Sequence, residues 1–190
     1  MIHRFQKSLQ HERDQAEKAD RIYREVLKAT DIVRFNTDSE SDMEMQRQDI
    51  DLLLTIRGTT FKISEKFRDK DYGDLYIEVY SKYPHTKGWM HTGKPNAIIY
   101  FTPTSVYWIT HNSLFECFEK ILLPAIPEVW YLELYQSQQS ICTKKVQFKD
   151  IETNIQLIQA HNFEGKAWET IGISIQFDVL TKLSVKFKKI

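Results

Sequence analysis

The amino-acid sequence predicts a mixed α/β fold, of the α+β kind, built as a single domain over residues 1–190. Three observations support this prediction. An apolar stripe with helical spacing lies near the N-terminus, short runs that alternate apolar and polar residues follow it, and a second helical run in the middle ends at prolines. A chain of 190 residues is long enough for one core that buries roughly 70% of its unfolded surface.

The first predicted element is a helix over residues 3–29. Its apolar residues recur at helical spacing between Ala19 and Leu27 and form one stripe. Residues 1–19 are polar nearly all round and are predicted to be an N-terminal helical extension. This extension would project into solvent or pack on a partner.

Alternating runs through the first 110 residues predict strands. They are residues 31–35, 50–56, 60–68, 74–82, 97–101 and 106–110. An acidic loop over residues 36–42 (NTDSESD) separates the first two strands. The turn at residues 57–59 joins the next two into an antiparallel hairpin, and residues 74–82 are predicted to be the third neighbouring strand.

A second helix is predicted from Asn112 or Ser113 to about Leu123, because either residue can cap a helix and Pro124 and Pro127 stop it. Beyond it the pattern predicts strands at residues 129–135, 144–148 and 170–177, and helices at residues 150–160 and 178–183.

The composition restricts the classes of protein to which this chain can belong. Basic and acidic side chains balance at 26 each, so a phosphate-binding surface would need local clustering of charge. With only two cysteines, a reducing cytoplasm is the expected location rather than a disulfide-rich setting. The sequence has no HExxH, Walker, GxGxxG or GxSxG element. It also has no signal peptide and no apolar run of the ~20 residues that a membrane span needs.

Charged side chains interrupt three of the predicted strands, and their types suit phosphodiester hydrolysis. Asp51 opens the first strand of the hairpin, Glu65 and Lys66 lie in the second, and the third contains Glu78. A charged residue inside an apolar strand is uncommon unless it is paired or at a surface. Carboxylates can hold a divalent ion that activates water, and a lysine can orient that water or offset charge on the phosphate.

This part of the chain resembles the metal-dependent PD-(D/E)XK nucleases, in a branch found in bacteria and associated with phages. The resemblance covers roughly residues 20–115 and rests on the motifs Gln46-x-x-Asp49-Ile50-Asp51, Ser64-Glu65-Lys66-Phe67-Arg68, Asp74 to Glu78, Gly88-Trp89, residues 97–100 and residues 106–109. It implies a restriction-endonuclease-like core, in which an N-terminal helix packs on a mixed central β-sheet with further helices.

The resemblance also implies roles for individual residues. Asp51 would be a metal ligand and Lys66 the catalytic lysine, while Glu65 or Glu78 would supply the second carboxylate. The implied activity is that of an endonuclease dependent on Mg²⁺ or Mn²⁺, acting on DNA more than on RNA. A homodimer that uses the N-terminal helix would suit cleavage of two strands.

Two departures from the family pattern bear on activity. Ile50 precedes Asp51 where the family has proline, and Ser64 stands where the family has an acid two residues before the lysine. In a regular strand Ser64 and Lys66 share one face while Glu65 points to the other, so Glu65 joins Lys66 only through a bulge or a strong twist. The alternative is a catalytically inactive nuclease-fold protein that binds nucleic acid or a protein partner.

A third interpretation needs no site. Asp51 would begin a strand after a turn, Glu65 and Lys66 would form an exposed charge pair, and Glu78 would be a polar position on a solvated face. The chain would then be a structural or interaction protein.

Overall fold

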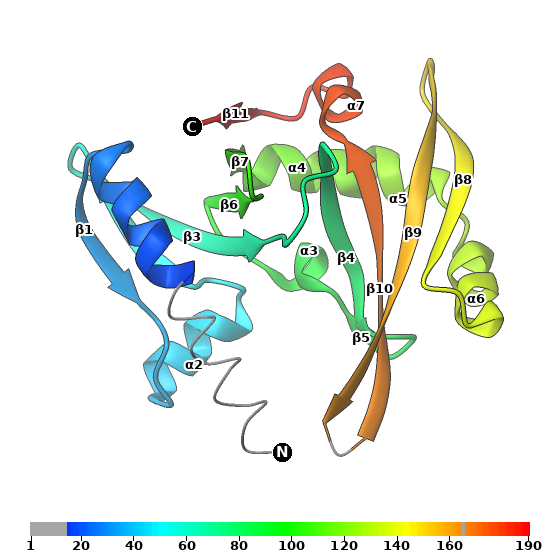
Figure 1. The fold of residues 1–190 in the computed structure, drawn as a ribbon, viewed down its shortest axis with the longest axis horizontal. Coiled ribbons are helices and arrows are strands. Elements are labelled where there is room, and N and C mark those ends of the chain that lie inside the picture. Colours follow the sequence, from blue (N-terminus) through cyan, green and yellow to red (C-terminus); the bar gives the residue numbers. More distant parts are fainter. Residues whose placement is uncertain (1–14, 165) are drawn as a thin grey trace.

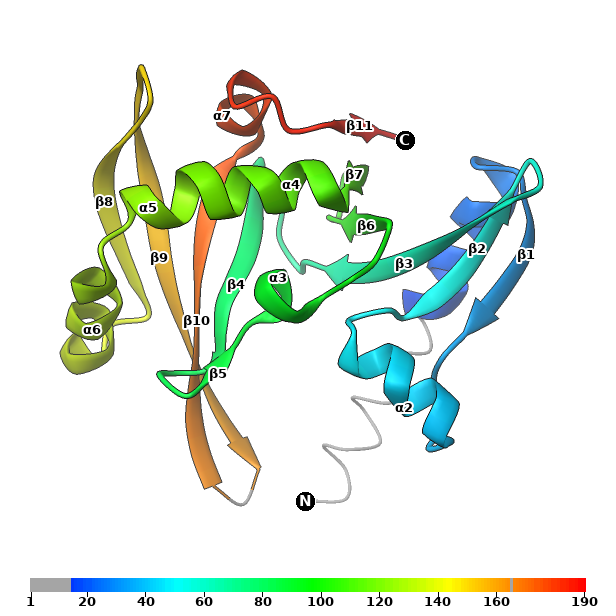
Figure 2. The same cartoon turned by 180° about the vertical axis from the view of Figure 1, so that it is seen from behind.

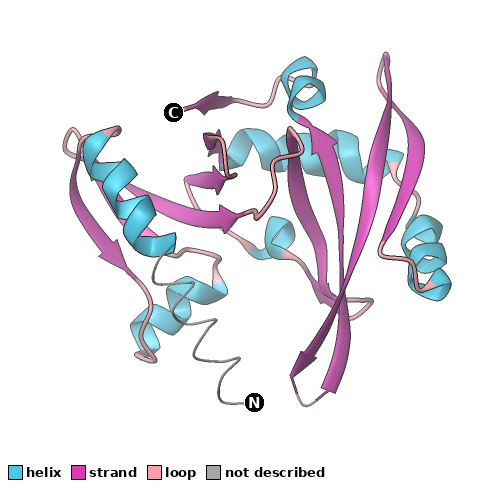
Figure 3. Cartoon of the chain, viewed as in Figure 1, coloured by secondary structure: helices cyan, strands magenta, loops and turns pink. Residues whose placement is uncertain are grey.

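The computed structural model describes residues 15–164 and 166–190, which form a mixed α+β fold with two β-sheets and several helices (Figure 1, Figure 3). Residues 15–25 are helical, so the prediction of a helix over residues 3–29 is confirmed for this part, but it is wrong for residues 26–29, where the helix has ended and a strand begins at Ala29. The first half of that predicted helix lies outside the described residues. This N-terminal helix lies against the first sheet, beside β1 and β3 in Figure 1.

The first sheet has the strand order β1-β2-β3-β6-β7-β11 and is mixed, because β3 and β6 run parallel while its other pairs are antiparallel. Its strands are β1 (Ala29–Arg34), β2 (Leu52–Ile56), β3 (Thr59–Phe67), β6 (Ala97–Phe101), β7 (Val106–Thr110) and β11 (Phe187–Lys189). The sequence predicts the first five to within two residues. Arg57 and Gly58 both have positive φ, 50° and 77°, which is the geometry of a two-residue type I′ hairpin turn.

The second sheet is antiparallel throughout, in the order β5-β4-β10-β9-β8. Its strands are β4 (Asp74–Lys82), β5 (Thr86–Lys87), β8 (Ile141–Phe148), β9 (Ile151–Glu164) and β10 (Lys166–Gln176). The expectation that residues 74–82 pair beside the hairpin is wrong, because β3 pairs with β6 and β4 pairs with β10. The strand β6 (AIIYF) is buried along its whole length, which suits a strand paired on both sides and covered on both faces.

The helices beyond residue 25 are α2 (Glu40–Arg47), α3 (Trp89–Thr92), α4 (His111–Cys117), α5 (Leu123–Ala125), α6 (Glu128–Ser137) and α7 (Phe177–Lys182). The acidic loop predicted over residues 36–42 ends inside α2, because Ser39 caps that helix by accepting the N–H of Asp42. A π-helical turn (Phe118–Leu122) joins α4 to α5 just before Pro124, which has no N–H to donate. No helix in the described part of the chain is both long and apolar enough to cross a membrane.

The sequence-based prediction is wrong for two segments of the second half. Residues 129–135, predicted as a strand, form α6, in which Tyr131 and Leu134 are buried about one helical turn apart. The segment 150–160, predicted as a helix, is part of β9 from residue 151 onward, where Ile155, Leu157 and Gln159 alternate with more exposed side chains. In the first case tertiary packing overrides the strand preference of a Val-, Trp- and Tyr-rich run.

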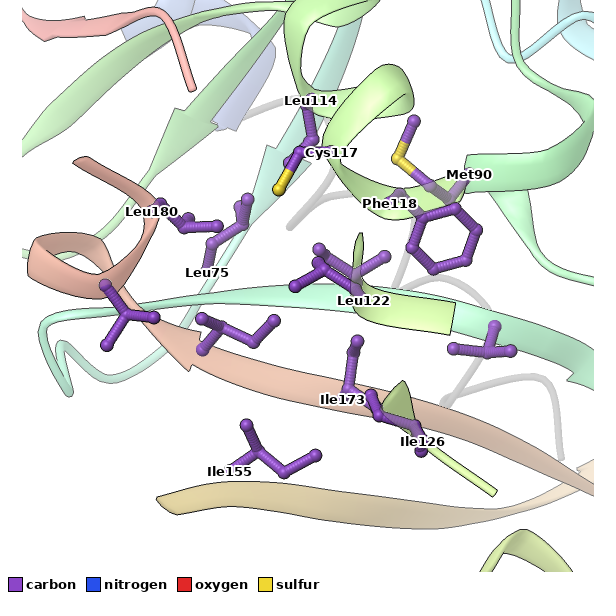
Figure 4. Packing of buried hydrophobic residues seen from close by; sticks show 14 of the residues in the cluster. Leu75, Met90, Leu114, Cys117, Phe118, Leu122, Ile126, Ile155, Ile173 and Leu180 are labelled. Carbon is purple, nitrogen blue, oxygen red and sulfur yellow. The ribbon is translucent and has the colours of Figure 1, made fainter. Parts of the chain in front are cut away.

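Buried apolar side chains form two clusters. The larger lies between the second sheet and the helical run from α4 to α5, which crosses that sheet in Figure 2. Figure 4 shows Leu75, Ile155 and Ile173 of this sheet facing side chains of the helical run such as Leu114, Phe118 and Leu122. The smaller cluster packs Ala19 and Tyr23 of the N-terminal helix on one face of the first sheet. A helix on a mixed sheet is therefore present.

Ile173→Ala should destabilise the fold strongly, because the Ile173 side chain is fully buried between the second sheet and the α4–α5 run. We expect the free energy of unfolding, measured in urea, to fall by about 2–5 kcal/mol. Ile141→Ala on β8 is the matched control, since Ile141 is 53% exposed and its truncation should cost less than about 1 kcal/mol. Equal losses at the two positions would contradict this account of the core.

Candidate active site

A cavity of about 380 Å³ opens where β3 of the first sheet lies near β4 of the second. Its charged lining residues are Asp49, Lys66, Arg68 and Glu78, and aromatic side chains complete the wall. The elements that supply these residues are the segment before β2, the end of β3, the middle of β4, the start of α3 and the strand β6. Residues far apart in the chain thus converge on one hollow.

Asp49 is the carboxylate that meets Lys66. The Lys66 Nζ donates to Asp49 Oδ1 at 2.6 Å, and the Ser64 Oγ donates to Asp49 Oδ2 at 2.7 Å. Asp49 has a φ of 55°, a left-handed conformation that Asp tolerates better than most residues. The backbone before β2 thereby turns the Asp49 carboxylate onto the face of β3 that presents Ser64 and Lys66.

Asp49 stands in one of the family-like motifs, but the resemblance implies no role for it. A signal for it exists in the chain. Ser64 and Lys66 share a strand face and both carry donors, so a carboxylate opposite them was to be expected. Asp49 and Asp51 were the nearby acids, and their position two residues apart did not decide between them.

Glu78 reaches the same cavity from β4. A Cβ at Gly88 would lie 2.3 Å from the Glu78 carbonyl oxygen and 2.8 Å from its Cγ, so the backbone before α3 can approach Glu78 only with glycine there. Burial raises the pKa of the Glu78 carboxyl, while the Trp89 N–H and the positive charge of Lys66 act to lower it. The charge of Asp49 acts to raise the same pKa, so both Lys66 and Asp49 lie close enough to Glu78 to affect its ionisation.

Asp51 lies on the same side of β3 but is bonded to the sheet itself. Its Oδ2 accepts the backbone N–H of Glu65 at 2.6 Å. Burial raises the pKa of the Asp51 carboxyl, and the charge of Lys66 opposes that rise. The lining of the cavity includes Asp49 and Glu78 rather than Asp51. Asp51 therefore supports the site from beside it.

Glu65 faces the opposite side of the first sheet. Its carboxylate accepts Arg34 Nη1 at 2.6 Å and Tyr23 Oη at 2.6 Å, and Arg34 also binds Asp20 at 2.6 Å. The pairing of β3 with β6 is regular from Ile63 to Phe67, so the bulge that would turn Glu65 towards Lys66 is absent from this described stretch. The structure thus brings Asp51, Lys66 and Glu78 to one side of β3 and places Glu65 on the other.

The donor set of the cavity can be compared with the needs of a divalent ion. Within residues 15–164 and 166–190, no three His, Cys, Asp or Glu side chains gather as a ready metal-binding group. Magnesium, however, is commonly held by one or two carboxylates with water as the remaining ligands. Asp49 and Glu78 are oxygen donors of this kind, and both line the cavity, with Lys66 bonded to Asp49.

Comparison of the chain with known protein families, with curated protein sequences and with solved structures finds no match. The function proposed below is therefore argued from the geometry of this cavity and from the residues that line it.

Glu78→Gln should stabilise the protein at neutral pH. Because burial raises the pKa of Glu78, the folded state holds this proton to a higher pH than the unfolded chain does, and stability falls as the pH rises from the ordinary glutamate range through the raised pKa. Glutamine removes the cost of burying the charge. We expect a higher free energy of unfolding than wild type near pH 7, and a gain that fades towards about pH 4.

The control for this measurement is Glu152→Gln on β9, whose side chain is 61% exposed and pairs with Lys145. It should bring no comparable gain. A Glu78→Gln variant less stable than wild type at neutral pH would show that the carboxylate is favourably placed rather than costly.

Glu65→Ala should lower the stability of the fold, because it removes one of the two carboxylates that pair with the partly buried Arg34 and leaves the Tyr23 hydroxyl without its acceptor. We expect a loss of roughly 3 kcal/mol in urea unfolding, at the lower end of what breaking a buried ion pair costs. Glu133→Ala, which opens an exposed pair with Lys144, should cost less than about 1 kcal/mol. Comparable small effects for both variants would argue against a buried network between the N-terminal helix and β3.

Proposed function

We propose that this chain is a divalent-metal-dependent nuclease that hydrolyses phosphodiester bonds in DNA, with a core of the PD-(D/E)XK, restriction-endonuclease-like kind. The observation that carries the proposal is the convergence of Asp49, Lys66 and Glu78 on one cavity, where Lys66 binds Asp49 at 2.6 Å. Two acids and a lysine held close together by a rigid scaffold are what metal-assisted attack on a phosphate requires.

The position of Ser64 supports this interpretation. The family pattern has an acid two residues before the lysine, and this chain has serine there. The Ser64 side chain is fully buried, and its hydroxyl donates to Asp49 Oδ2. A carboxylate is therefore present on the same strand face as Lys66, although it comes from the segment before β2 instead of from β3.

The chemistry that Mg²⁺ or Mn²⁺ supplies when bound is activation of a water and stabilisation of charge on the phosphate. Asp49 and Glu78 would hold the ion. Asp51, fixed by the Glu65 N–H, adds negative charge beside them. The Lys66 ammonium would orient the attacking water or offset charge on a phosphate oxygen.

Arg68 extends the positive charge along the same wall. Its guanidinium lies 5.4 Å from the centre of the Tyr76 ring and 3.8 Å from Asp74, so it is held at the mouth of the cavity by two neighbours. A guanidinium in this place suits contact with a phosphate oxygen next to the one that reacts.

The alternative is a nuclease-fold protein that binds nucleic acid or a protein partner without cleaving it. One observation favours it: both oxygens of Asp49 already accept hydrogen bonds from the protein, from Lys66 and from Ser64. An ion would have to compete with the Lys66 ammonium for Asp49 Oδ1.

Asp49→Asn, Lys66→Met and Glu78→Gln should each lower the rate of metal-dependent DNA cleavage by about 100-fold or more, because each removes a group at the reacting phosphate. The measurement is release of fragments from labelled DNA with Mg²⁺ or Mn²⁺. The controls are Asp150→Asn and Lys145→Met, exposed charges on the second sheet whose loss should leave the rate unchanged.

An Mn²⁺ titration, measured by isothermal calorimetry, separates the two candidate functions. Binding that weakens in Asp49→Asn and Glu78→Gln supports the nuclease. The nuclease proposal is overturned if wild-type protein cleaves no DNA with either ion and Mn²⁺ binding is unchanged in these variants and in Asp51→Ala.

A further inference from the structure

Tyr76 is a tyrosine of the candidate active site to which the nuclease chemistry above assigns no role. It lies on β4 two residues before Glu78, so the two side chains share one face of the strand, opposite the fully buried apolar side chains. Both residues line the cavity, together with Lys66 and Arg68. A phenol group therefore belongs to the same hollow as the acids and the cations.

The Tyr76 ring is held in place by its neighbours. A Cβ added at Gly172 of β10 would lie 2.5 Å from both Cε2 and Cζ of this ring, so the ring occupies the space that a side chain at Gly172 would fill. Gly172 pairs with Glu78 in the register of β10 and β4, and the Arg68 guanidinium lies over the ring, 5.4 Å from its centre. Because Cζ carries the hydroxyl, the polar end of Tyr76 is fixed beside Glu78.

The backbone at Tyr76 is also tied to the other sheet. Its N–H donates to the Tyr100 hydroxyl at 3.1 Å, and Tyr100 is a buried residue of β6 in the first sheet. This hydrogen bond joins the two sheets at the cavity. It thereby fixes the position of Tyr76, in the second sheet, relative to Lys66 in the first.

The Tyr76 hydroxyl keeps its proton at neutral pH. Burial raises the pKa of Tyr76, and the charge of Glu78 raises it further, although the Arg68 guanidinium acts to lower it. A protonated phenol donates a hydrogen bond without carrying charge. A further lysine or arginine in this place would instead repel a metal ion held by the carboxylates of the cavity.

Arg68 has donors available on the same side of the cavity. Its guanidinium lies 3.8 Å from Asp74, which is longer than a hydrogen bond, and Asp74 in turn accepts the Ser174 hydroxyl. A guanidinium carries five N–H donors. The pair with Asp74 therefore orients Arg68 and leaves its donors for a ligand.

We propose that the Tyr76 hydroxyl and the Arg68 guanidinium together bind the non-bridging oxygens of a substrate phosphate, so that Tyr76 is a substrate-binding residue of the site. The proposal rests on the nuclease function above and adds to it the neutral donor that seats the phosphate. In this arrangement Tyr76 and Arg68 hold the phosphate, while Asp49 and Glu78 hold the metal ion.

Tyr76→Phe keeps the ring against Gly172 and under Arg68 and removes only the hydroxyl. We expect kcat/KM for DNA cleavage with Mg²⁺ to fall roughly 10- to 100-fold, because a hydrogen bond to a charged phosphate oxygen is lost. The affinity for thymidine 3′,5′-bisphosphate, measured by isothermal calorimetry in the same buffer, should fall by a similar factor. This probe has no phosphodiester bond to cleave, so it reports on phosphate binding alone.

The matched control is Tyr135→Phe on α6. Tyr135 is 36% exposed and lies outside the lining of the cavity, so the loss of its hydroxyl should leave both measurements unchanged. Circular dichroism spectra and thermal midpoints equal to those of wild type establish that both variants are folded.

The inference is overturned if Tyr76→Phe binds the bisphosphate as tightly as wild type does, or if wild type does not bind it. Failure of the nuclease is a different result. If wild type cleaves no DNA with Mg²⁺ or Mn²⁺ but binds the bisphosphate more tightly than Tyr76→Phe does, the phosphate site stands and the nuclease does not. If Tyr76→Phe cleaves DNA with the kcat/KM of wild type, the nuclease stands and the role of Tyr76 does not.

Discussion

The alternation of side chains along β3 is the constraint on which the rest of this structure depends. β3 is an interior strand, with β2 on one side and β6 on the other. Its hydrogen bonds to both neighbours keep the strand regular, so successive side chains point to opposite faces. Glu65 points to the N-terminal helix and binds Arg34 and Tyr23, which fastens that helix to the sheet. Ser64 and Lys66 point the other way, into the cavity. One strand therefore organises both the attachment of the helix and the candidate active site.

The cavity concentrates features that cost the fold stability. Burial raises the pKa of both Asp51 and Glu78, because the charged form of each carboxylate is disfavoured away from water. Asp49 adopts a left-handed backbone conformation, and Gly88 permits a contact with Glu78 that any larger residue would prevent. Costly groups persist where the surrounding structure over-determines them, and such places are commonly functional. This concentration distinguishes the cavity from the exposed ion pairs elsewhere, such as Lys145 with Glu152.

The division into two sheets gives the site its shape. β3 and β4 are consecutive in the chain yet belong to different sheets, and the acids and cations of the cavity come from both. Had β4 paired directly with β3, Glu78 would lie in the same pleated surface as Lys66, and the hollow between them would close.

The sequence by itself determined the local features of this protein. Short apolar and alternating runs were enough to place β2, β3, β4, β6 and β7, and the period of two in a strand predicts that Glu65 and Lys66 face opposite ways. Only the tertiary structure decided that β6 lies beside β3, that residues 128–137 are helical, that residues 151–164 are a strand, and that Asp49 is the acid that meets Lys66. The reason is physical. The alternation of side chains along a strand and the conformation of a turn depend on residues close together in the sequence. The pairing of strands depends on burial of both their faces, which involves residues far apart in the sequence. Asp49 rather than Asp51 meets Lys66 because its backbone is left-handed, a conformation that local sequence does not require, and because Ser64 and Lys66, 15 and 17 residues further along the chain, donate to its carboxylate.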